Sequence, residues 1–405
     1  MITEKLPLHY SRALLAERSH LYIRSKIMLT LFAITFSVAG FGHQYTRTDL
    51  TVDVASTSST AANKDPNLVN AWGLSRSSTG PWWISDNGTG LSTLYDLNGV
   101  PQPLVVTIPP GSSGTSAPTG TVFNYTTEFK IQQQQGGAQA KAIFLFVTED
   151  GTISGWNPTV NATIAVIAVN RSGEAIYKGC AIAQTKKGSR FYATNFQSGK
   201  VEVFDGAFKP IHLDEHAFRL DDHEFSHDDH DFDKGASSTN KSGSYVPFNI
   251  QNVGGNLVVT FAKKQAGAKD ETAGKGLGRV VVFDVNGHKL LSLQHGPWMN
   301  APWGIAMAPS DFGTFSHRLL IGNFGDGKIN AFNAVSGHFV GSLLDANNKP
   351  NPLVIDGLWA ISFGGGNLKS GASSELYFTA GPNDEANGLF GKLTADPLEQ
   401  KGNTE

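Results

Sequence analysis

The residues whose types could do chemistry recur at two places of a repeated pattern. The first place follows the start of an apolar strand and is held by Trp72, Thr119, Cys180, Phe248, Trp303 and Trp359. The second place ends the next strand and is held by Asp86, Glu149, Asn195, Phe261, Asn323 and Ala380, with Asn70, Asn249 and Asn252 close by. Indole rings can stack on a sugar or another flat ligand, and carboxylate and amide oxygens can hold calcium or magnesium.

Each set also has a structural interpretation, which we favour. Large aromatic residues at strand starts can wedge adjacent sheets together. Cys180 is then a small buried hydrophobic residue. Asp86 and Glu149 begin the sequences Asp-Asn-Gly and Glu-Asp-Gly, which are typical of turns whose side chains bond their own backbone. Ligand binding by the first set and metal binding by the second set stay open as alternatives.

A histidine-rich and acidic segment between His212 and Asp233 is the other candidate for metal chemistry. Its histidines are His212, His216, His223, His227 and His230. Imidazole suits zinc, copper or nickel, and two of the spacings place histidines four residues apart, as on one side of a helix. The segment is almost free of aliphatic residues, so we expect a loop with weak metal binding. It has no cysteine, which excludes a finger-type zinc site.

A short phrase that recurs about every fifty residues shows which elements must position these residues. The phrase reads turn, glycine, strand, then an aromatic residue with Asp or Asn; clear copies begin at Asp150, Ser198, Gly278 and Asp326, and looser ones at Gly90 and Asn387. Two further apolar strands and an outer strand accompany each copy, which predicts four-stranded antiparallel units. Six such units predict an all-β fold, a six-bladed β-propeller.

The N-terminal segment from about residue 46 to residue 55 alternates like a strand and is predicted to complete the last blade, which would leave no open edge. The predicted propeller is a single domain over residues 45–395. Residues 211–244 are expected to be a flexible insertion within it, and residues 396–405 a disordered tail.

Composition restricts the class of protein. The chain has 405 residues with 45 glycines, 17% charged residues and a net charge of −3. No basic stripe accompanies this charge, so nucleic acid is not an expected partner. The single cysteine excludes an intramolecular disulfide.

Residues 1–39 have the order of a secretory signal peptide. Basic residues precede a short apolar run over residues 27–38, and small residues follow. We therefore expect export to a periplasm or the extracellular space, no membrane span after cleavage, and a monomer. A membrane anchor is the alternative for this run, although it is shorter than the length of about 20 apolar residues that a spanning helix needs.

Three motifs carry a resemblance to known propellers. They are Asn-x-Trp-Gly-Leu at Asn70–Leu74, Pro-Phe-Asn-Ile-Gln-Asn at Pro247–Asn252, and Ala-Pro-Trp-Gly at Ala301–Gly304. Over residues 45–395 the chain resembles an exported bacterial family of conserved hypothetical six-bladed propellers, within the NHL and gluconolactonase-like superfamily. That resemblance implies a fold and no assigned reaction.

Three functional hypotheses follow. The first is a binding module without chemistry, whose aromatic and amide-rich centre takes a small molecule or a protein partner. The second is a lactonase-like hydrolase with a divalent cation such as calcium on Asp86, Glu149, Asn195 and Asn323. The resemblance does not supply the metal ligands of such enzymes residue by residue, because Asn70, Asn249 and tryptophans stand where those enzymes have Glu and Asp. The third is an envelope metal-binding protein that holds zinc through the histidine segment. We favour the first.

Overall fold

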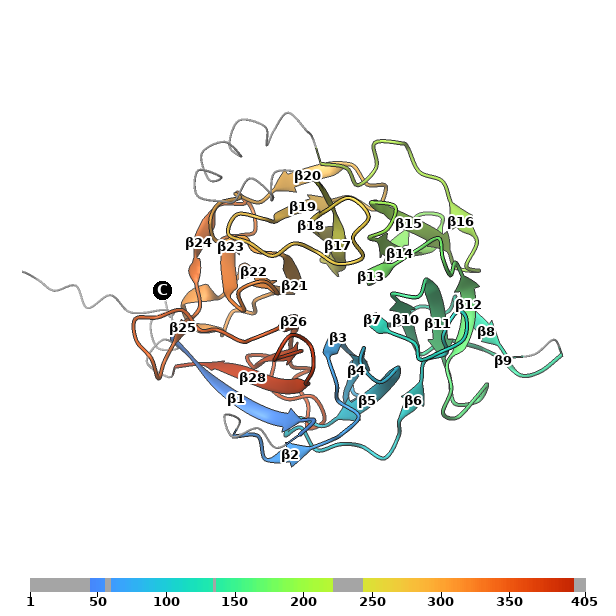
Figure 1. Ribbon diagram of the computed structural model, residues 1–405, viewed down its shortest axis with the longest axis horizontal. Coiled ribbons are helices and arrows are strands. Elements are labelled where there is room, and N and C mark those ends of the chain that lie inside the picture. The colour runs from blue at the N-terminus through green and yellow to red at the C-terminus, as the bar shows by residue number, and fades with distance from the viewer. Residues whose placement is uncertain (1–43, 55–59, 134–135, 221–242, 397–405) are drawn as a thin grey trace, which may run out of the picture. The chain divides into compact units, whose positions relative to one another are not determined.

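Six four-stranded units surround a common centre in the computed structural model of the protein (Figure 1). The structure describes residues 44–54, 60–133, 136–220 and 243–396. All six sheets belong to one compact unit, Phe41–Glu405. The all-β, six-bladed propeller predicted from the repeat is therefore confirmed.

Each blade is an antiparallel meander that starts at the centre of the ring. The innermost strands are β3 (Ala71–Arg76), β7 (Pro118–Phe123), β13 (Tyr177–Thr185), β17 (Ser244–Val253), β21 (Pro302–Met307) and β26 (Leu358–Phe363). The second strands are β4 (Trp82–Asp86), β10 (Phe144–Thr148), β14 (Gly188–Asn195), β18 (Asn256–Lys264), β22 (Arg318–Asn323) and β27 (Leu376–Ala380).

The third strands come from the repeated phrase. They are β5 (Leu91–Tyr95), β11 (Thr152–Trp156), β15 (Lys200–Asp205), β19 (Arg279–Phe283), β23 (Ile329–Asn333) and β28 (Leu389–Ala395). The outer strands are β6 (Val106–Thr107), β12 (Val166–Asn170), β16 (Pro210–Ile211), β20 (Lys289–Ser292), β24 (Phe339–Ser342) and β1 (Gln44–Val52). Additional elements are β2 (Asn63–Lys64), β25 (Leu344–Asp345), the hairpin β8 (Lys130–Gln132) with β9 (Gln139–Lys141), and the 3-10 turn η3 (Gly313–Phe315).

The glycine of the repeated phrase makes the turn between the second and third strands. Gly327 has a φ of +67°, and a Cβ built on it would lie 2.1 Å from the carbonyl oxygen of Ile355 in the next blade. Only a residue without a side chain fits both this backbone conformation and this close approach. The repeat was readable in the sequence because each blade needs the same tight turn.

The ring closes through β1, which pairs antiparallel with β28 from Tyr45 to Val52. The strand predicted over about 46–55 is thus confirmed, beginning two residues earlier. Tyr45 is fully buried, and its hydroxyl donates a hydrogen bond of 3.0 Å to the carbonyl oxygen of Phe312 in blade five. Both chain ends are therefore held in one sheet, as closure of the ring requires.

Glycines also let the innermost strands approach one another. A Cβ on Gly73 of β3 would lie 2.3 Å from the carbonyl oxygen of Thr119 in β7, and one on Gly120 would lie 3.0 Å from the Cα of Gly179 in β13. Neighbouring blades therefore meet backbone to backbone close to the centre.

Several expectations concern residues outside the described ranges. These are the signal segment 1–39, residues 221–242 of the histidine-rich insertion, and residues 397–405 of the tail. Within the described ranges, no helix has the length and apolar character needed to cross a membrane.

We predict that Tyr45→Ala lowers the free energy of unfolding by about 3 kcal/mol, because it removes a buried aromatic ring from the closing strand. Thr46→Ala, an exposed position on the same strand, is the control and should change it by less than about 0.5 kcal/mol. Chemical denaturation measures both values. Equal losses in the two variants would contradict a closing role for the buried ring.

Candidate functional site

Strand register places a lysine in the inner ring of the propeller. The innermost and second strands pair first through Ala71 and Asp86 in blade one, and through Tyr177 and Asn195 in blade three. The next residue on each innermost strand occupies the inner ring. Its members are Trp72, Thr119, Lys178, Phe248, Trp303 and Trp359. Assignment of this position to Cys180 was therefore wrong by two residues.

The three tryptophans of the ring pack against one another and form a plug. Trp72 and Trp359 stack with ring centroids 3.6 Å apart, and Trp303 meets both edge-on at 6.1 and 5.9 Å. Phe324 stacks on Trp359 at 4.0 Å, and Phe248 meets it edge-on at 6.0 Å. Trp72, Trp303 and Trp359 are 2%, 4% and 0% exposed. Their rings are therefore buried against other aromatic side chains.

Lys178 lies against this plug with its ammonium group paired to carboxylates. Its side chain is 1% exposed, and its Nζ lies 5.0 Å from the ring centroid of Trp72 and 5.4 Å from that of Phe196. The Nζ is 2.5 Å from Oε1 of Glu149 and 3.0 Å from Oδ1 of Asp270. Two aromatic rings and two carboxylates therefore surround a buried cation.

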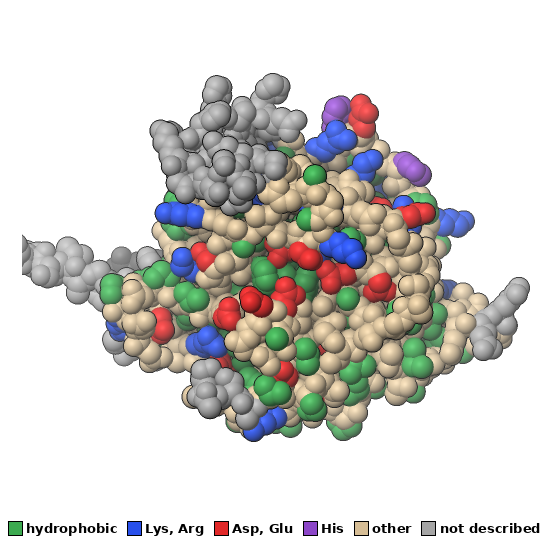
Figure 2. Space-filling view, viewed as in Figure 1, with side chains coloured by type: hydrophobic (Ala, Val, Ile, Leu, Met, Phe, Trp, Pro, Cys, Tyr) green, Lys and Arg blue, Asp and Glu red, His purple; other side chains and the backbone are tan. Residues whose placement is uncertain are grey.

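Asparagines connect the plug to the carboxylates. The Nε1 of Trp359 donates to Oδ1 of Asn70 at 3.0 Å, and Nδ2 of Asn70 donates to Glu385 and to Asn87. Asn87 in turn donates to Oε2 of Glu149 at 3.0 Å. Carboxylates gather around an apolar centre on the face shown in Figure 2. We call Glu149, Asp270, Glu271 and Glu385 the acidic mouth.

Burial and mutual charge shift the pKa values of this group. Burial opposes the charge of Lys178, but Glu149, Glu271 and Asp270 more than offset that effect and hold the pKa of Lys178 above its ordinary value. Burial raises the pKa of Glu271 to about 7, against the opposing charge of Lys178. Burial also raises the pKa of Glu385, which the hydrogen bond from Asn70 counteracts in part. Glu271 therefore holds its proton at pH values where free glutamate has lost it, and the pKa of Glu385 is shifted in the same direction.

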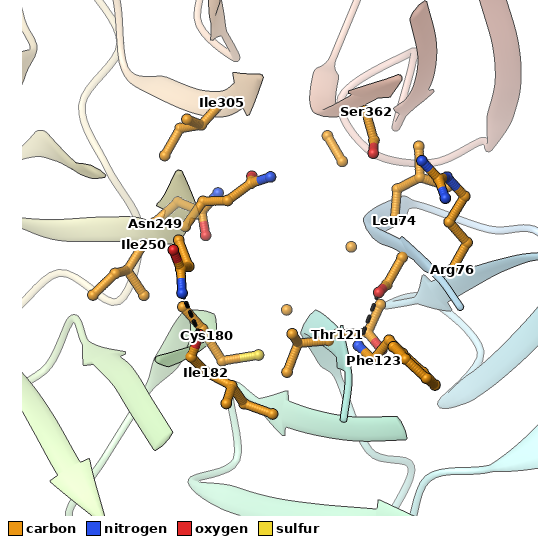
Figure 3. Close-up of a pocket in the computed structure, with 18 of the residues that line it drawn as sticks. Leu74, Arg76, Thr121, Phe123, Cys180, Ile182, Asn249, Ile250, Ile305 and Ser362 are labelled. Atoms are coloured by element: carbon orange, nitrogen blue, oxygen red, sulfur yellow. Dashed lines mark hydrogen bonds between the residues drawn. The ribbon is translucent and has the colours of Figure 1, made fainter. Parts of the chain in front are cut away.

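A cavity of about 390 Å³ lies beyond the plug, along the later residues of the innermost strands. Trp303, Cys180 and Asn249 line it where the side chains are buried, and Tyr125, which is 51% exposed, lines it toward solvent. Its wall includes one apolar side chain from each of the six blades, Leu74, Val122, Ile182, Ile250, Ile305 and Ile361. Figure 3 shows Cys180, Leu74 and Ile305 arranged around this space.

Asn249 and Trp303 therefore contribute to the cavity, while the remaining predicted residues divide into two sets. Trp72, Trp359, Phe248, Asn70 and Glu149 meet at the plug and the acidic mouth, as described above. Asp86, Asn195 and Asn323 make hydrogen bonds that stabilise their own blades. Asp86 is fully buried, accepts a hydrogen bond from Thr93, and has its pKa raised by burial. Asn195 accepts from the backbone of its own turn, at Gln197 and Ser198.

The described residues form no cluster of metal ligands that would support either metal hypothesis. Asn323 donates to the carbonyl oxygen of Trp298 and to Asp326, so it shares no partner with Asp86 or Glu149. His212 and His216 are exposed, and His216 lies in a turn and not in a helix. His223, His227 and His230 fall outside the described residues. Within the described ranges, no group of three His, Cys, Asp or Glu side chains could hold a metal ion.

The sequence contained a signal for Lys178 that the pattern analysis missed. Glycine follows the inner-ring residue in Trp72-Gly73, Thr119-Gly120 and Trp303-Gly304, and equally in Lys178-Gly179. Aligning the glycines would have selected Lys178. Asp270, Glu271 and Glu385 come from loops between strands, for which the repeat gives no register.

Two proteins of Acanthamoeba polyphaga mimivirus are similar to this chain over most of its length. Uncharacterized protein R648 is 29% identical over 349 residues, covering 85% of this chain and 80% of the viral protein. Uncharacterized protein L690 is 30% identical over 345 residues, covering 84% and 83%. These relatives are viral and not bacterial, which corrects the expected bacterial family. No protein-family model matches the chain.

Solved propellers are similar in fold only. Virginiamycin B lyase from Staphylococcus aureus is 11% identical with a TM-score of 0.45, over 87% of this chain and 100% of that one. A glucose dehydrogenase is 12% identical with a TM-score of 0.47, over 82% and 98%. Neither likeness supports an inference about activity.

The raised pKa of Glu271 predicts that stability falls as pH rises. A carboxyl group that is protonated more readily when folded contributes its full stabilisation below the ordinary pKa of 4.5, and that contribution is lost as pH rises to about 7. Thermal unfolding between pH 4.5 and pH 8 should show a smaller decline in Glu271→Gln than in the wild type. Identical pH profiles would show that Glu271 titrates normally.

Lys178→Met should lower the free energy of unfolding by about 3 kcal/mol, because it leaves Glu149 and its neighbours without their counter-ion. Lys328→Met, which breaks an ion pair with side chains 36% and 23% exposed, is the control and should cost less than about 1 kcal/mol. The loss in Lys178→Met should shrink at pH 5, where Glu271 is protonated and needs no counter-ion. Denaturation at pH 5 and pH 8 measures this, and a loss equal to that of the control would refute the arrangement.

Proposed function

The chain belongs to the same protein family as mimivirus protein L690, and we propose that its propeller is a binding module that holds a small organic molecule in the central cavity. The observation that carries this proposal is the cavity itself. Its volume of about 390 Å³ falls in the range of small-molecule pockets, and it combines an apolar wall with a few polar groups, as such pockets do.

The plug gives this cavity a closed end. Trp303 lines the cavity, and its Nε1 donates to the carbonyl oxygen of Lys178 at 3.2 Å. The layer that contains Trp72, Trp303 and Trp359 therefore separates the cavity from the acidic mouth. A molecule in the cavity would contact the indole of Trp303 from the side opposite to Lys178.

Three polar side chains of the cavity wall are already fixed in place. Asn249 donates to the carbonyl oxygen of Trp303 at 2.8 Å, and Thr121 donates to that of Leu145 at 3.2 Å. Asn252 donates to the carbonyl oxygen of Ile182 at 2.8 Å. The two asparagine bonds link neighbouring blades, and the threonine bond joins two strands of one blade. They hold the wall in one shape, so the pocket is formed before a ligand binds, which lowers the entropic cost of binding.

The burial of the tryptophans moves the proposed site away from where the sequence suggested it. Stacking of a ligand on the three indoles would require opening the plug, whereas the cavity offers Trp303 without rearrangement. Cys180 also lines it, but burial raises the pKa of its thiol. The thiolate is the reactive form of cysteine, and a raised pKa leaves little of it. We therefore propose no nucleophilic role for Cys180.

Blocking the cavity should abolish binding of an apolar probe. N-phenyl-1-naphthylamine, whose fluorescence rises in apolar surroundings, is titrated into the wild type and into Ser362→Trp, which places an indole in the cavity. We expect the variant to bind at least about tenfold more weakly. Val335→Trp, at a position 88% exposed, is the matched control and should bind like the wild type.

The proposal fails if Ser362→Trp, with an unchanged thermal midpoint, takes up the probe as the wild type does. It fails equally if the wild type shows no saturable uptake.

A further inference from the structure

Among the described residues that line the cavity, Arg76 alone has a charged side chain. The other lining residues are apolar, hydroxyl, amide, glycine or cysteine residues. Arg76 belongs to the last residues of β3, so it lies at the end of the cavity away from the plug. Its charge therefore decides which ligands the cavity prefers.

Arg76 is held rigidly by neutral groups. Its Nε and Nη2 donate to the carbonyl oxygen of Phe363 at 3.1 and 3.0 Å, and Nη2 also donates to that of Gly364 at 3.0 Å. Its guanidinium carbon lies 5.4 Å from the ring centroid of Trp82. These contacts fix the guanidinium between blades one and six.

No carboxylate among the described residues pairs with this guanidinium. Its partners among the described residues are backbone carbonyl groups and an aromatic ring. Burial lowers the pKa of Arg76, so its surroundings disfavour the charge that it carries. A half-buried cation without a counter-ion is costly, and an anion in the adjacent cavity would offset that cost.

One edge of the guanidinium is available for this purpose. Its Nη1 makes no hydrogen bond to another described residue, and Ser362, which lies on the same side of the cavity (Figure 3), makes none through its hydroxyl. Both groups can donate to an oxygen atom. Together they add a positive charge and a hydroxyl group to a cavity whose wall combines aliphatic side chains with hydroxyl and amide groups.

The acidic mouth adds to the preference for an anionic ligand at the Arg76 end of the cavity. Glu149, Asp270, Glu271 and Glu385 lie on the other side of the plug, and those of them that are ionised repel anions there. An anion therefore reaches the centre of the propeller from the Arg76 end, and a cation is drawn to the opposite mouth.

Resting on the proposed function, we infer that the ligand is an organic anion: an apolar body in the cavity with a carboxylate or sulfonate group on Arg76 and Ser362. The apolar body contacts the isoleucines of the wall and Trp303. The anionic group stays at the wetter end of the cavity, where its desolvation is least complete.

A pair of probes that differ only in charge tests this inference. 8-Anilinonaphthalene-1-sulfonate has the ring system of N-phenyl-1-naphthylamine with a sulfonate added. Fluorescence titrations compare both probes on the wild type, Arg76→Gln, Arg76→Lys and the control Arg47→Gln, which removes a charge from β1 at the outside of the last blade.

We expect Arg76→Gln to weaken the sulfonate probe at least about tenfold and to leave the neutral probe unchanged. Arg76→Lys and Arg47→Gln should retain most of the sulfonate binding. If Arg76→Gln weakens both probes equally, or neither, the anion inference is overturned while the binding function stands. If Ser362→Trp leaves the neutral probe unaffected, the binding function itself is overturned.

A second measurement needs no variant. Naphthalene-1-sulfonate and 1-naphthylmethylammonium compete with the neutral probe for the wild-type protein. We expect the anion to displace the probe at a concentration at least about tenfold lower than the cation. Equal potency, or a more potent cation, would overturn the inference.

Discussion

The buried ammonium group of Lys178 imposes the arrangement of everything around it. A cation with a side chain 1% exposed must find compensation inside the protein, since its desolvation costs several kcal/mol. Glu149 and Asp270 supply opposite charge, and the faces of Trp72 and Phe196 supply their π electrons. The carboxylates therefore lie on one side of the plug, and Trp72 of the plug lies against the ammonium group. The inner ring otherwise consists of aromatic residues and Thr119. Its one lysine therefore makes the two ends of the propeller's centre different in charge.

This polarity separates two environments along the axis. The acidic mouth holds several carboxyl groups near one cation, and burial keeps Glu271 protonated up to about pH 7. Beyond the plug, the described residues that line the cavity are neutral apart from Arg76. The tryptophans, which are rigid and closely stacked, keep these environments apart. A propeller with an open channel would mix them, and the preference for an organic anion at the Arg76 end depends on their separation.

The sequence predicted the architecture well because the fold repeats a local requirement. Each blade needs the same turn, as at Gly327, and the six copies of the phrase predict six third strands. Closure by β1 followed from an unpaired strand pattern at one end of the domain.

The site was predicted less well. The inner ring was found in five blades, but the slip from Lys178 to Cys180 hid the cation, because hydrophobicity alone cannot distinguish positions two residues apart on one strand. Asp86 and Asn195 were candidates by residue type, yet a carboxylate that ends a strand serves equally as a buried hydrogen-bond acceptor or a turn former. Arg76 and Glu385 depend on contacts between blades far apart in sequence, which no local pattern reveals.

The central claim is that the plug leaves the cavity open toward Arg76 and closed toward the acidic mouth. Cys180 is the only cysteine of the chain and lines the cavity, so the rate of its modification reports on which ions arrive there. Mass spectrometry can follow its reaction with an anionic and a cationic methanethiosulfonate, (2-sulfonatoethyl) and (2-trimethylammonioethyl), with each rate divided by that for free cysteine. The account predicts that the anionic reagent reacts faster by at least about threefold, because Arg76 attracts it and the plug excludes the acidic mouth. A faster cationic reagent would show that Cys180 communicates with the carboxylates and would contradict the account.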